Sequence, residues 1–178
     1  MLSKSVKILL TGLPGCGKTT AIIQIADSLK HGKIAGFYTK EVRENTIRKG
    51  FSWTRLDGAT GILAHTDIKG PYRVGKYGVD VVSFEKSVVS ILDIEQNLAD
   101  LFIIDEIGRM ECMSEKFVNA VRRLFASEKS ILATVAQKGR GFISEIKYYR
   151  DVKLFHLSHQ NYDKIINAIS QILFFEKR

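Results

Sequence analysis

Short apolar runs alternate along this chain with stretches in which apolar residues recur every three or four positions. The short runs are typical of buried strands, and the wider spacing is typical of helices that pack on a sheet. We expect strands at residues 6–10, 34–39, 101–106 and 131–135. We expect helices at residues 22–29, 117–125 and 162–173. This alternation predicts an α/β fold with a mostly parallel central sheet and helices on both faces.

The middle of the chain departs from this alternation. Residues 47–55 and 60–65 predict two further strands, and polar turns precede them at residues 43–45 and 57–58. Because such short connections join antiparallel neighbours, we expect an antiparallel hairpin extension of the sheet. Residues 79–84 predict one more strand, and apolar residues at helical spacing follow between residues 88 and 99.

A glycine-rich segment joins the first expected strand to the first expected helix. It matches G-x-x-x-x-G-K-[ST] at every fixed position, and its residues, followed by Thr20, are Gly12, Leu13, Pro14, Gly15, Cys16, Gly17, Lys18 and Thr19. Such a loop directs backbone N–H groups and a helix dipole toward one point, where a polyphosphate binds. Lys18 would neutralise the β- and γ-phosphates, and the Thr19 hydroxyl would bind Mg²⁺. A glycine-rich turn that binds nothing is the alternative, which the flanking strand and helix disfavour.

A second segment places two carboxylates at the end of an apolar strand. Its residues are Leu101, Phe102, Ile103, Ile104, Asp105, Glu106, Ile107 and Gly108. Open α/β sheets bind ligands at the carboxyl ends of their strands, so we expect Asp105 to help Thr19 bind Mg²⁺. Glu106 is expected to accept a hydrogen bond from the attacking water and align it with the γ-phosphate. The alternative is that the two carboxylates only begin a loop.

Three segments of the chain resemble a known family. They are residues 12–19, residues 36–43 and the run Asp105-Glu106-Ile107-Gly108-Arg109-Met110-Glu111. The chain resembles, over essentially its whole length, the P-loop nucleoside-triphosphatase family that includes the animal cancer-related nucleoside triphosphatase and its archaeal and bacterial relatives. The third segment is the specific one, because many families share phosphate loops. The resemblance implies a RecA-like fold, Mg²⁺-dependent hydrolysis of several nucleoside triphosphates to diphosphates, and weak discrimination among bases.

A cation near the γ-phosphate is the remaining catalytic candidate. Arg140 follows the expected strand at 131–135, in a turn with Lys138, so it should emerge at the ligand edge of the sheet. There it would act as an arginine finger in cis, and a solvated basic turn is an equal alternative. Arg109 and Arg43 are weaker candidates for this role. Glu111 fits a place near the metal and a purely structural role equally well.

The chain has 178 residues and a formal net charge of +8. Its length suits one domain over residues 1–178. Basic residues surround the expected hairpin, which also carries Phe51 and Trp53: they are Lys40, Arg43, Arg48, Lys49 and Arg55. This composition suits a single-stranded nucleic-acid surface, but a solvated hairpin with inward-packed rings is the favoured interpretation.

Cysteine content and hydropathy bear on the compartment. Cys16 and Cys112 form no C-x-x-C pair and have no histidine at metal-ligand spacing, which favours a reducing cytoplasm. A regulatory disulfide between them is a minor alternative. Residues 1–7 lack the apolar stretch of a signal peptide, and no window contains the roughly 20 apolar residues that cross a bilayer. We therefore expect no membrane partner.

The leading functional hypothesis is an enzyme that hydrolyses the β–γ bond of nucleoside triphosphates with Mg²⁺. A small nucleotide or nucleoside kinase shares the size, loop and fold, but only Lys138 and Arg140 occupy a plausible lid position. A nucleic-acid-associated ATPase that uses the basic hairpin is the third hypothesis. A base-specific GTPase is not expected, because the chain has no N-K-x-D segment and no glutamine directly after Gly108.

Overall fold

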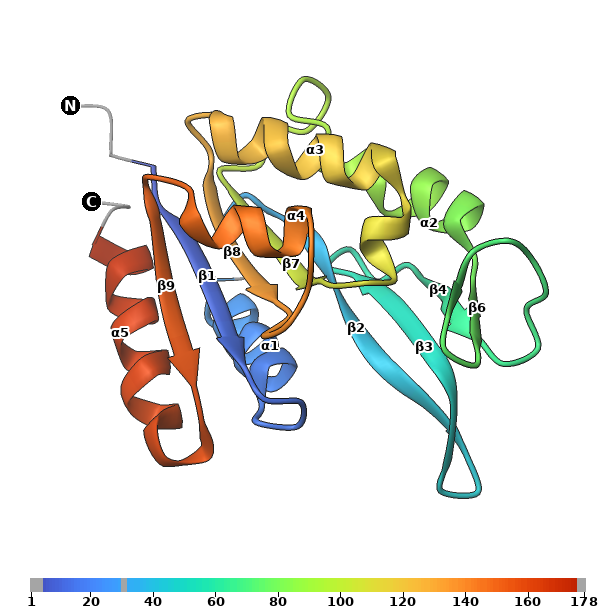
Figure 1. Cartoon of the computed structure of the whole chain (residues 1–178). Coiled ribbons are helices and arrows are strands. Elements are labelled where there is room, and N and C mark those ends of the chain that lie inside the picture. The colour runs from blue at the N-terminus through green and yellow to red at the C-terminus, as the bar shows by residue number, and fades with distance from the viewer. Residues whose placement is uncertain (1–4, 30–31, 176–178) are drawn as a thin grey trace.

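The computed structural model describes residues 5–29 and 32–175, so part of the amino-terminal segment considered above lies outside it. Its strands are β1 (Lys7–Gly12), β2 (Ile34–Glu44), β3 (Ile47–Arg55), β4 (Thr60–His65), β5 (Arg73–Val74), β6 (Tyr77–Val79), β7 (Leu101–Ile107), β8 (Ser130–Val135) and β9 (Val152–Leu157). These strands join one sheet in the order β5-β6-β4-β3-β2-β7-β8-β1-β9 (Figure 1).

The sheet is accompanied by helices and by single turns of 3₁₀ helix. The α-helices are α1 (Lys18–Ser28), α2 (Val81–Ser87), α3 (Glu115–Ala126), α4 (Phe142–Glu145) and α5 (Tyr162–Phe175). The 3₁₀ turns are η1 (Val89–Leu92), η2 (Glu111–Met113), η3 (Ile146–Tyr148) and η4 (His159–Asn161). None of the helices in the described ranges has the length and hydropathy that crossing a bilayer would require.

Five strands on one side of the sheet run parallel. β7 pairs with β2 and β8, and β1 pairs with β8 and β9, each time in parallel. Their carboxyl ends therefore meet at one edge of the sheet, which is where α/β proteins bind ligands. This half confirms the mostly parallel sheet that the alternating pattern predicts.

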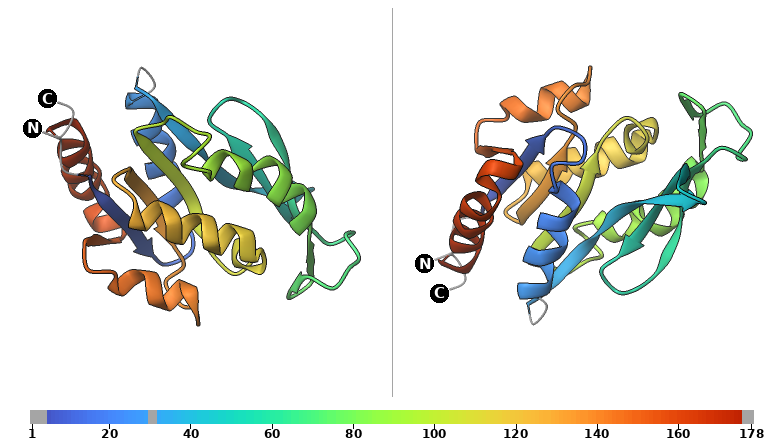
Figure 2. Two further views of the ribbon diagram at one scale, coloured as in Figure 1. Left: turned by 90° about the horizontal axis from the view of Figure 1, so that it is seen from above. Right: turned by 90° about the horizontal axis from the view of Figure 1, so that it is seen from below.

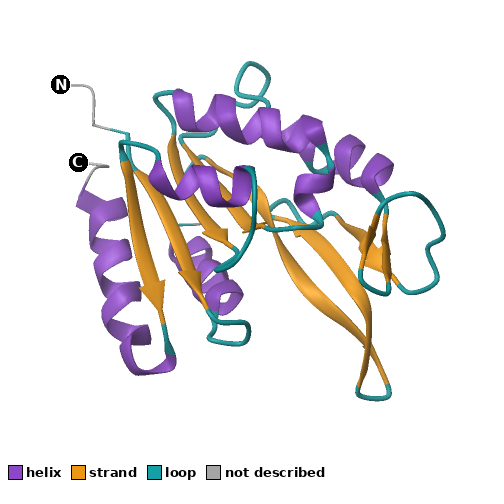
Figure 3. Cartoon of the chain, in the orientation of Figure 1, coloured by secondary structure: helices purple, strands orange, loops and turns teal. Residues whose placement is uncertain are grey.

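Helices cover both faces of this parallel half (Figures 2 and 3). α1 and α5 bury residues such as Ile22 and Ile169 in one core, and α2 and α3 bury Phe84 and Phe117 in the other. The rings of Phe84 and Phe117 lie against Phe37 of β2, with centroids 5.7 and 6.2 Å from it. Because both faces of the sheet are covered, its central strands are apolar at consecutive positions.

The other half of the sheet is antiparallel and is continuous with the first half through β2. Residues 34–37 of β2 pair with β7, and residues 37–44 pair with β3. Asn45 and Thr46 connect β2 to β3 with positive φ angles of 46° and 72°, which is the geometry of a tight hairpin. β4, β6 and β5 continue the antiparallel pairing. The β2–β3 hairpin projects beyond the rest of the sheet (Figure 1), so the predicted antiparallel extension is confirmed.

Two expectations for the segment before β7 are wrong. The strand expected at 79–84 ends at Val79, because the Asp80 carboxylate accepts a hydrogen bond from the Ser83 N–H at 2.9 Å and caps α2. The helical spacing between residues 88 and 99 produces only η1, because the Asp93 carboxylate accepts from the Glu95 N–H at 3.0 Å and forms a turn. Both corrections come from aspartate side chains, which the apolar spacing does not register.

The two cysteines lie in different cores. Cys16 belongs to the core under α1 and α5, whereas Cys112 packs against the core under α2 and α3, across the sheet. Both are free thiols. The structure has no disulfide between them, and the alternative of a regulatory disulfide stays a prediction.

Candidate functional site

The glycine-rich segment at residues 12–19 joins β1 to α1 at the carboxyl edge of the parallel strands. Gly15 and Gly17 have φ angles of 79° and 97°, a left-handed region in which a larger residue is strained. Gly17 is also packed closely, because a Cβ there would lie 3.0 Å from the Tyr162 ring at the start of α5. The two glycines let the backbone turn immediately before the positive end of the α1 dipole.

Lys18 extends over this loop. Its Nζ donates to the carbonyl oxygens of Gly12 at 3.2 Å and Leu13 at 3.4 Å, and it lies 3.7 Å from Oε2 of Glu106. The Lys18 side chain is 10% exposed. An ammonium group in this position is placed to neutralise phosphate oxygens held by the loop.

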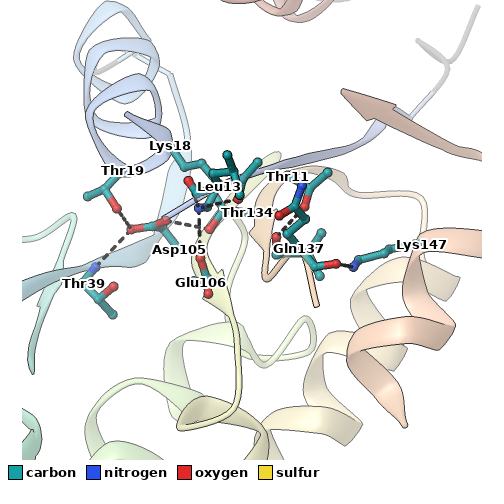
Figure 4. A network of polar contacts seen from close by, with 12 residues as sticks. Thr11, Leu13, Lys18, Thr19, Thr39, Asp105, Glu106, Thr134, Gln137 and Lys147 are labelled. Atoms are coloured by element: carbon teal, nitrogen blue, oxygen red, sulfur yellow. Dashed lines mark hydrogen bonds and ion pairs between the residues drawn. The ribbon is translucent and has the colours of Figure 1, made fainter. Parts of the chain in front are cut away.

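Asp105 is a buried carboxylate surrounded by three hydrogen-bond donors (Figure 4). Its Oδ2 accepts from the Thr19 hydroxyl at 2.8 Å and from the Thr39 N–H at 3.3 Å, and its Oδ1 accepts from the Thr134 hydroxyl at 2.6 Å. Burial raises the pKa of Asp105, and these hydrogen bonds together with the Lys18 charge act against the rise. The donors come from α1, β2 and β8, so three elements fix one carboxylate.

The pair formed by Thr19 and Asp105 suits Mg²⁺. This ion prefers oxygen ligands and is usually held by one or two protein groups together with substrate phosphates. A hydroxyl and a carboxylate oxygen 2.8 Å apart beside the phosphate loop are donors of this kind. The described residues contain no cluster of three or more His, Cys, Asp or Glu side chains arranged for a metal. A cation site that substrate completes is therefore what these residues fit.

Glu106 follows Asp105 and faces Lys18. Consecutive side chains of a regular strand point to opposite faces, but the β7–β8 register shifts between Ile104 and Ile107. This irregularity lets both carboxylates reach the site. Burial raises the pKa of Glu106 most strongly, while Lys18 lowers it and Asp105 raises it. A carboxylate at this position can accept a proton from water.

Glu111 lies behind the two carboxylates, on η2, and is 5% exposed. A Cβ on Gly108 would lie 2.8 Å from Oε2 of Glu111 and 3.0 Å from Oε1 of Glu106, so the two carboxyl groups flank the same glycine. Burial raises the pKa of Glu111 to about 8, and the charges of Glu106 and Asp105 contribute to the rise. The folded chain therefore holds the proton of Glu111 more tightly than an exposed glutamate would hold it.

The four cationic candidates for a finger lie at the surface. Arg140, Lys138 and Arg109 are exposed on loops. Arg43 lies on the β2–β3 hairpin and pairs with Glu41 at 2.6 Å. Arg140 follows β8 as expected, and its role as a finger stays a prediction. Arg43 instead forms its ion pair within the hairpin.

Two contributors to the site, and one lysine near it, were not predicted from the sequence. Thr39 lies within the family-like segment 36–43 but donates through its backbone N–H, which any residue type except proline supplies. Thr134 is the one hydroxyl residue in the apolar run at residues 131–135 of β8, a pattern that could have marked it. Lys147 of η3 donates from its Nζ to the Gln137 carbonyl oxygen at 2.9 Å (Figure 4). No local signal marks Lys147, because its position depends on how the chain folds back after β8.

The basic hairpin packs its aromatic rings inward. Trp53 is 4% exposed, and Phe51 packs edge-on against Tyr77 with ring centroids 5.5 Å apart. Arg48 lies over the Phe51 and Tyr77 rings and pairs with Glu41 at 2.7 Å. These rings are engaged in the fold instead of lying open for base stacking, as the favoured interpretation of the hairpin states.

A family model described as NTPase matches residues 7–170 of this chain. The chain belongs to this NTPase family. It is 44% identical over 172 residues to nucleoside-triphosphatase THEP1 of Thermotoga sp. (strain RQ2), covering 97% of this chain and 98% of that protein. It is 36% identical to the cancer-related nucleoside-triphosphatase of Homo sapiens, covering 91% of this chain and 93% of the human protein. The family predicted from the three sequence segments is confirmed.

Two solved structures share the fold of this NTPase-family chain. The crystal structure of THEP1 from the hyperthermophile Aquifex aeolicus has a TM-score of 0.85 at 33% identity, covering 92% of this chain and 96% of the other. The solution structure of a human cancer-related nucleoside triphosphatase has a TM-score of 0.79 at 34% identity, covering 95% of this chain and 97% of the other. The predicted α/β P-loop NTPase fold is therefore confirmed.

Proposed function

We propose that this chain hydrolyses the β–γ bond of nucleoside triphosphates with Mg²⁺ and with little discrimination among bases. The observation that carries the proposal is the convergence of a phosphate loop with two carboxylates. Thr19 lies 2.8 Å from Asp105, and Lys18 lies 3.7 Å from Glu106. The similar proteins named nucleoside-triphosphatases support the type of reaction.

Substrate binding is assigned to the phosphate loop and to Lys18. The N–H groups around Gly15 and Gly17 and the α1 N-terminus would hold the polyphosphate, and Lys18 would exchange its carbonyl partners for phosphate oxygens. Thr19 and Asp105 would hold Mg²⁺, which when bound neutralises charge on the phosphate oxygens. Every nucleoside triphosphate carries the polyphosphate that these groups contact, and this supports the proposed breadth.

Glu106 is assigned the role of orienting the attacking water. Its carboxylate would accept a hydrogen bond from that water and orient the oxygen toward the γ-phosphorus. A bond forms between the water oxygen and the γ-phosphorus, and the bond from this phosphorus to the β–γ bridging oxygen breaks. The diphosphate leaves with the electron pair, and the proton from water passes to Glu106. Burial raises the pKa of Glu106, and the nearby Lys18 charge opposes that rise and so favours the ionised carboxylate that this step requires.

The direct test compares wild type with Glu106→Gln. Phosphate release is measured with Mg²⁺ from a panel of nucleoside tri-, di- and monophosphates. The variant should bind triphosphate as wild type does while its turnover falls at least ~10²-fold, the scale of a lost proton-handling group. Glu44→Gln, which alters an exposed carboxylate on the hairpin, is the matched control. Wild type that releases no phosphate from any triphosphate would overturn the proposal, and full turnover by Glu106→Gln would remove that residue from its role.

The same panel separates the other hypotheses. Candidate nucleoside and nucleotide acceptors are added in one arm, and transfer that outpaces hydrolysis would identify a small kinase instead. RNA and DNA are added in another arm, where salt-dependent stimulation of hydrolysis would identify a nucleic-acid-associated ATPase. A cytoplasmic location is part of the proposal and is supported by the free thiols of Cys16 and Cys112.

A further inference from the structure

We propose that Lys147 is the second cation of the site and contacts the γ-phosphate as it is transferred. This inference rests on the proposed hydrolysis and deepens it. It assigns to a lysine on η3 the role that sequence reasoning gave to Arg140.

The path of the chain after β8 carries the inference. β8 ends beside the site, where the Thr11 hydroxyl donates to the Val135 carbonyl oxygen at 3.0 Å and the Ala136 N–H donates to the Ile107 carbonyl oxygen at 3.2 Å. The chain then runs outward to α4 and returns through η3. Lys147 reaches back from η3, and its ammonium group donates to the carbonyl oxygen of Gln137 at 2.9 Å. A cation from a distant segment thus lies at the carboxyl edge where β1, β7 and β8 end (Figure 4).

The element that carries Lys147 is anchored in the core. Ile143 of α4 is 4% exposed and Ile146 of η3 is fully buried, and both belong to the core under α2 and α3. Arg140 and Lys138, in the loop between β8 and α4, are exposed. Lys138 and Arg140 are therefore exposed at the surface, whereas the half-buried Lys147 is held by the Gln137 carbonyl oxygen close to the end of β8.

The charges around Lys147 agree with this placement. Burial lowers the pKa of Lys147, and the carboxylate of Glu106 opposes that change. The same carboxylate lies 3.7 Å from the Nζ of Lys18. Lys18 and Lys147 thus act on one carboxylate, the one assigned to the attacking water. An ammonium group has three N–H donors, so donors besides the one used by Gln137 can serve phosphate oxygens.

The proposed chemistry is stabilisation of charge. As the water oxygen bonds to the γ-phosphorus and the bridging oxygen departs with its electron pair, negative charge is spread over the three equatorial γ-oxygens. The water proton goes to Glu106, so Lys147 gives up no proton and stays a cation throughout. A cation supplied in cis at this point is worth on the order of 10³ to 10⁵ in rate where it operates. A lysine whose only role was to hydrogen-bond η3 to the Gln137 carbonyl oxygen would contribute no such rate enhancement.

The test uses the full chain and compares Lys147→Met with three other variants. Lys147→Gln removes the charge and keeps a donor for the Gln137 carbonyl oxygen, and Lys147→Arg keeps the charge. Lys116→Met is the matched control, because Lys116 is likewise a lysine with one polar partner, Glu85 at 2.8 Å, and it lies on α3. Circular dichroism and thermal unfolding establish that each variant is folded.

Three quantities are measured: kcat, affinity for a non-hydrolysable triphosphate, and affinity for a nucleoside diphosphate with aluminium fluoride, a mimic of the transferring phosphoryl group. Lys147→Met and Lys147→Gln should lower kcat at least ~10²-fold and weaken fluoroaluminate binding by a similar factor, with triphosphate affinity changed less than about threefold. Lys147→Arg should recover part of the loss, and Lys116→Met should resemble wild type.

The inference is overturned if Lys147→Gln keeps wild-type kcat, which would show that only the link to Gln137 matters. It is also overturned if both affinities fall equally, which indicates a structural effect, or if Arg140→Met reproduces the selective loss and the Lys147 variants do not. Wild type without hydrolysis would instead be a failure of the proposed function, so the two failures are distinguishable.

Discussion

The two halves of the sheet use their charged residues in opposite ways. In the antiparallel half, charged side chains pair locally at the surface, with Glu41 contacting both Arg43 and Arg48 at 2.6 and 2.7 Å. In the parallel half, Lys18 from α1 and the carboxylates of Asp105 and Glu106 from β7 come together at one edge of the sheet. The hairpin carries the more conspicuous cluster of basic residues in the sequence, yet Arg43, Arg48, Lys49 and Arg55 all pair with carboxylates nearby in the chain. Buried charged groups that converge from distant parts of the chain are therefore a better guide to function than the density of charge along the sequence.

The largest expected effect on substrate binding belongs to the parallel half. Lys18→Ala should weaken binding of a nucleoside triphosphate at least ~30-fold, since losing one partner of a buried charge contact costs about 2 kcal/mol or more. Lys49→Ala on the hairpin, which removes a lysine 3.8 Å from Glu44, should leave the affinity unchanged. Calorimetric titration with Mg²⁺ and a non-hydrolysable triphosphate measures both. Equal affinities for the two variants would contradict the assignment of residues 12–19 as a phosphate loop. They would also show that the two halves of the sheet do not differ in substrate binding.

A buried carboxyl group of the parallel half provides the next test. The pKa of Glu111, about 8, lies above the ordinary value of 4.5. As the pH rises, the unfolded chain therefore loses the Glu111 proton at a lower pH than the folded chain does. The contribution of Glu111 to stability is complete below pH 4.5 and is lost as the pH rises toward 8. Each unit of pKa difference corresponds to about 1.4 kcal/mol, so the loss amounts to a few kcal/mol.

Glu111→Gln should remove this pH dependence. Urea unfolding at pH 5 and at pH 8.5 should show the variant gaining stability relative to wild type at the higher pH, because the neutral amide has no proton to lose. Glu44→Gln, at an exposed position on the hairpin, should follow the wild-type curve. Parallel curves for wild type and Glu111→Gln would contradict the raised pKa.

A smaller effect is expected from the hydroxyl that orients Asp105. Thr134→Val removes the 2.6 Å hydrogen bond to Oδ1, and the loss of such a partner to a metal-binding carboxylate typically costs about 10–100-fold in metal affinity or activity. The concentration of Mg²⁺ that gives half-maximal turnover should rise. Thr54→Val alters an exposed threonine pair of the antiparallel half, with oxygens 3.5 Å apart, and should not change it. An unchanged Mg²⁺ requirement in Thr134→Val would show that this hydroxyl does not position the carboxylate.

The smallest effect is expected on the hairpin itself. Glu41→Gln removes the negative partner of Arg43 and Arg48 without changing the side-chain shape. Exposed ion pairs contribute little, so urea unfolding should show a loss of about 1 kcal/mol or less, and phosphate release should stay at the wild-type rate. A clear fall in turnover would show that the hairpin contributes to the site after all.

The sequence predicts those parts of the site whose chemistry is local. The glycine spacing of residues 12–19 and the apolar run ending in Asp105 and Glu106 each encode a strand and its functional end. Contributions that depend on pairing between distant segments are not encoded locally. Thr134 meets Asp105 only because β8 pairs with β7, and Lys147 reaches the sheet edge only because η3 packs back onto the core.

The fold shows the same division between local and distant causes. The antiparallel extension follows from short polar turns, which are local signals, and it was predicted correctly. The strand expected at 79–84 failed because apolar residues continue past Val79 while Asp80 already caps a helix. Asp80 and Ser83 together indicate a helix N-terminus, so the sequence does carry a signal against a strand at 79–84. The apolar residues of this segment outweighed that signal.

The hydrogen bond from the Thr39 N–H to Asp105 connects the two halves in a way that can be observed directly. Thr39 lies in the part of β2 that pairs with β3, yet its amide proton points at a carboxylate whose charge changes when a proton or a cation binds. The chemical shift of that single amide, and the rate at which it exchanges with deuterium, therefore follow the occupancy of the site. An isotope-labelled sample reports the state of Asp105 from a strand that belongs to the hairpin.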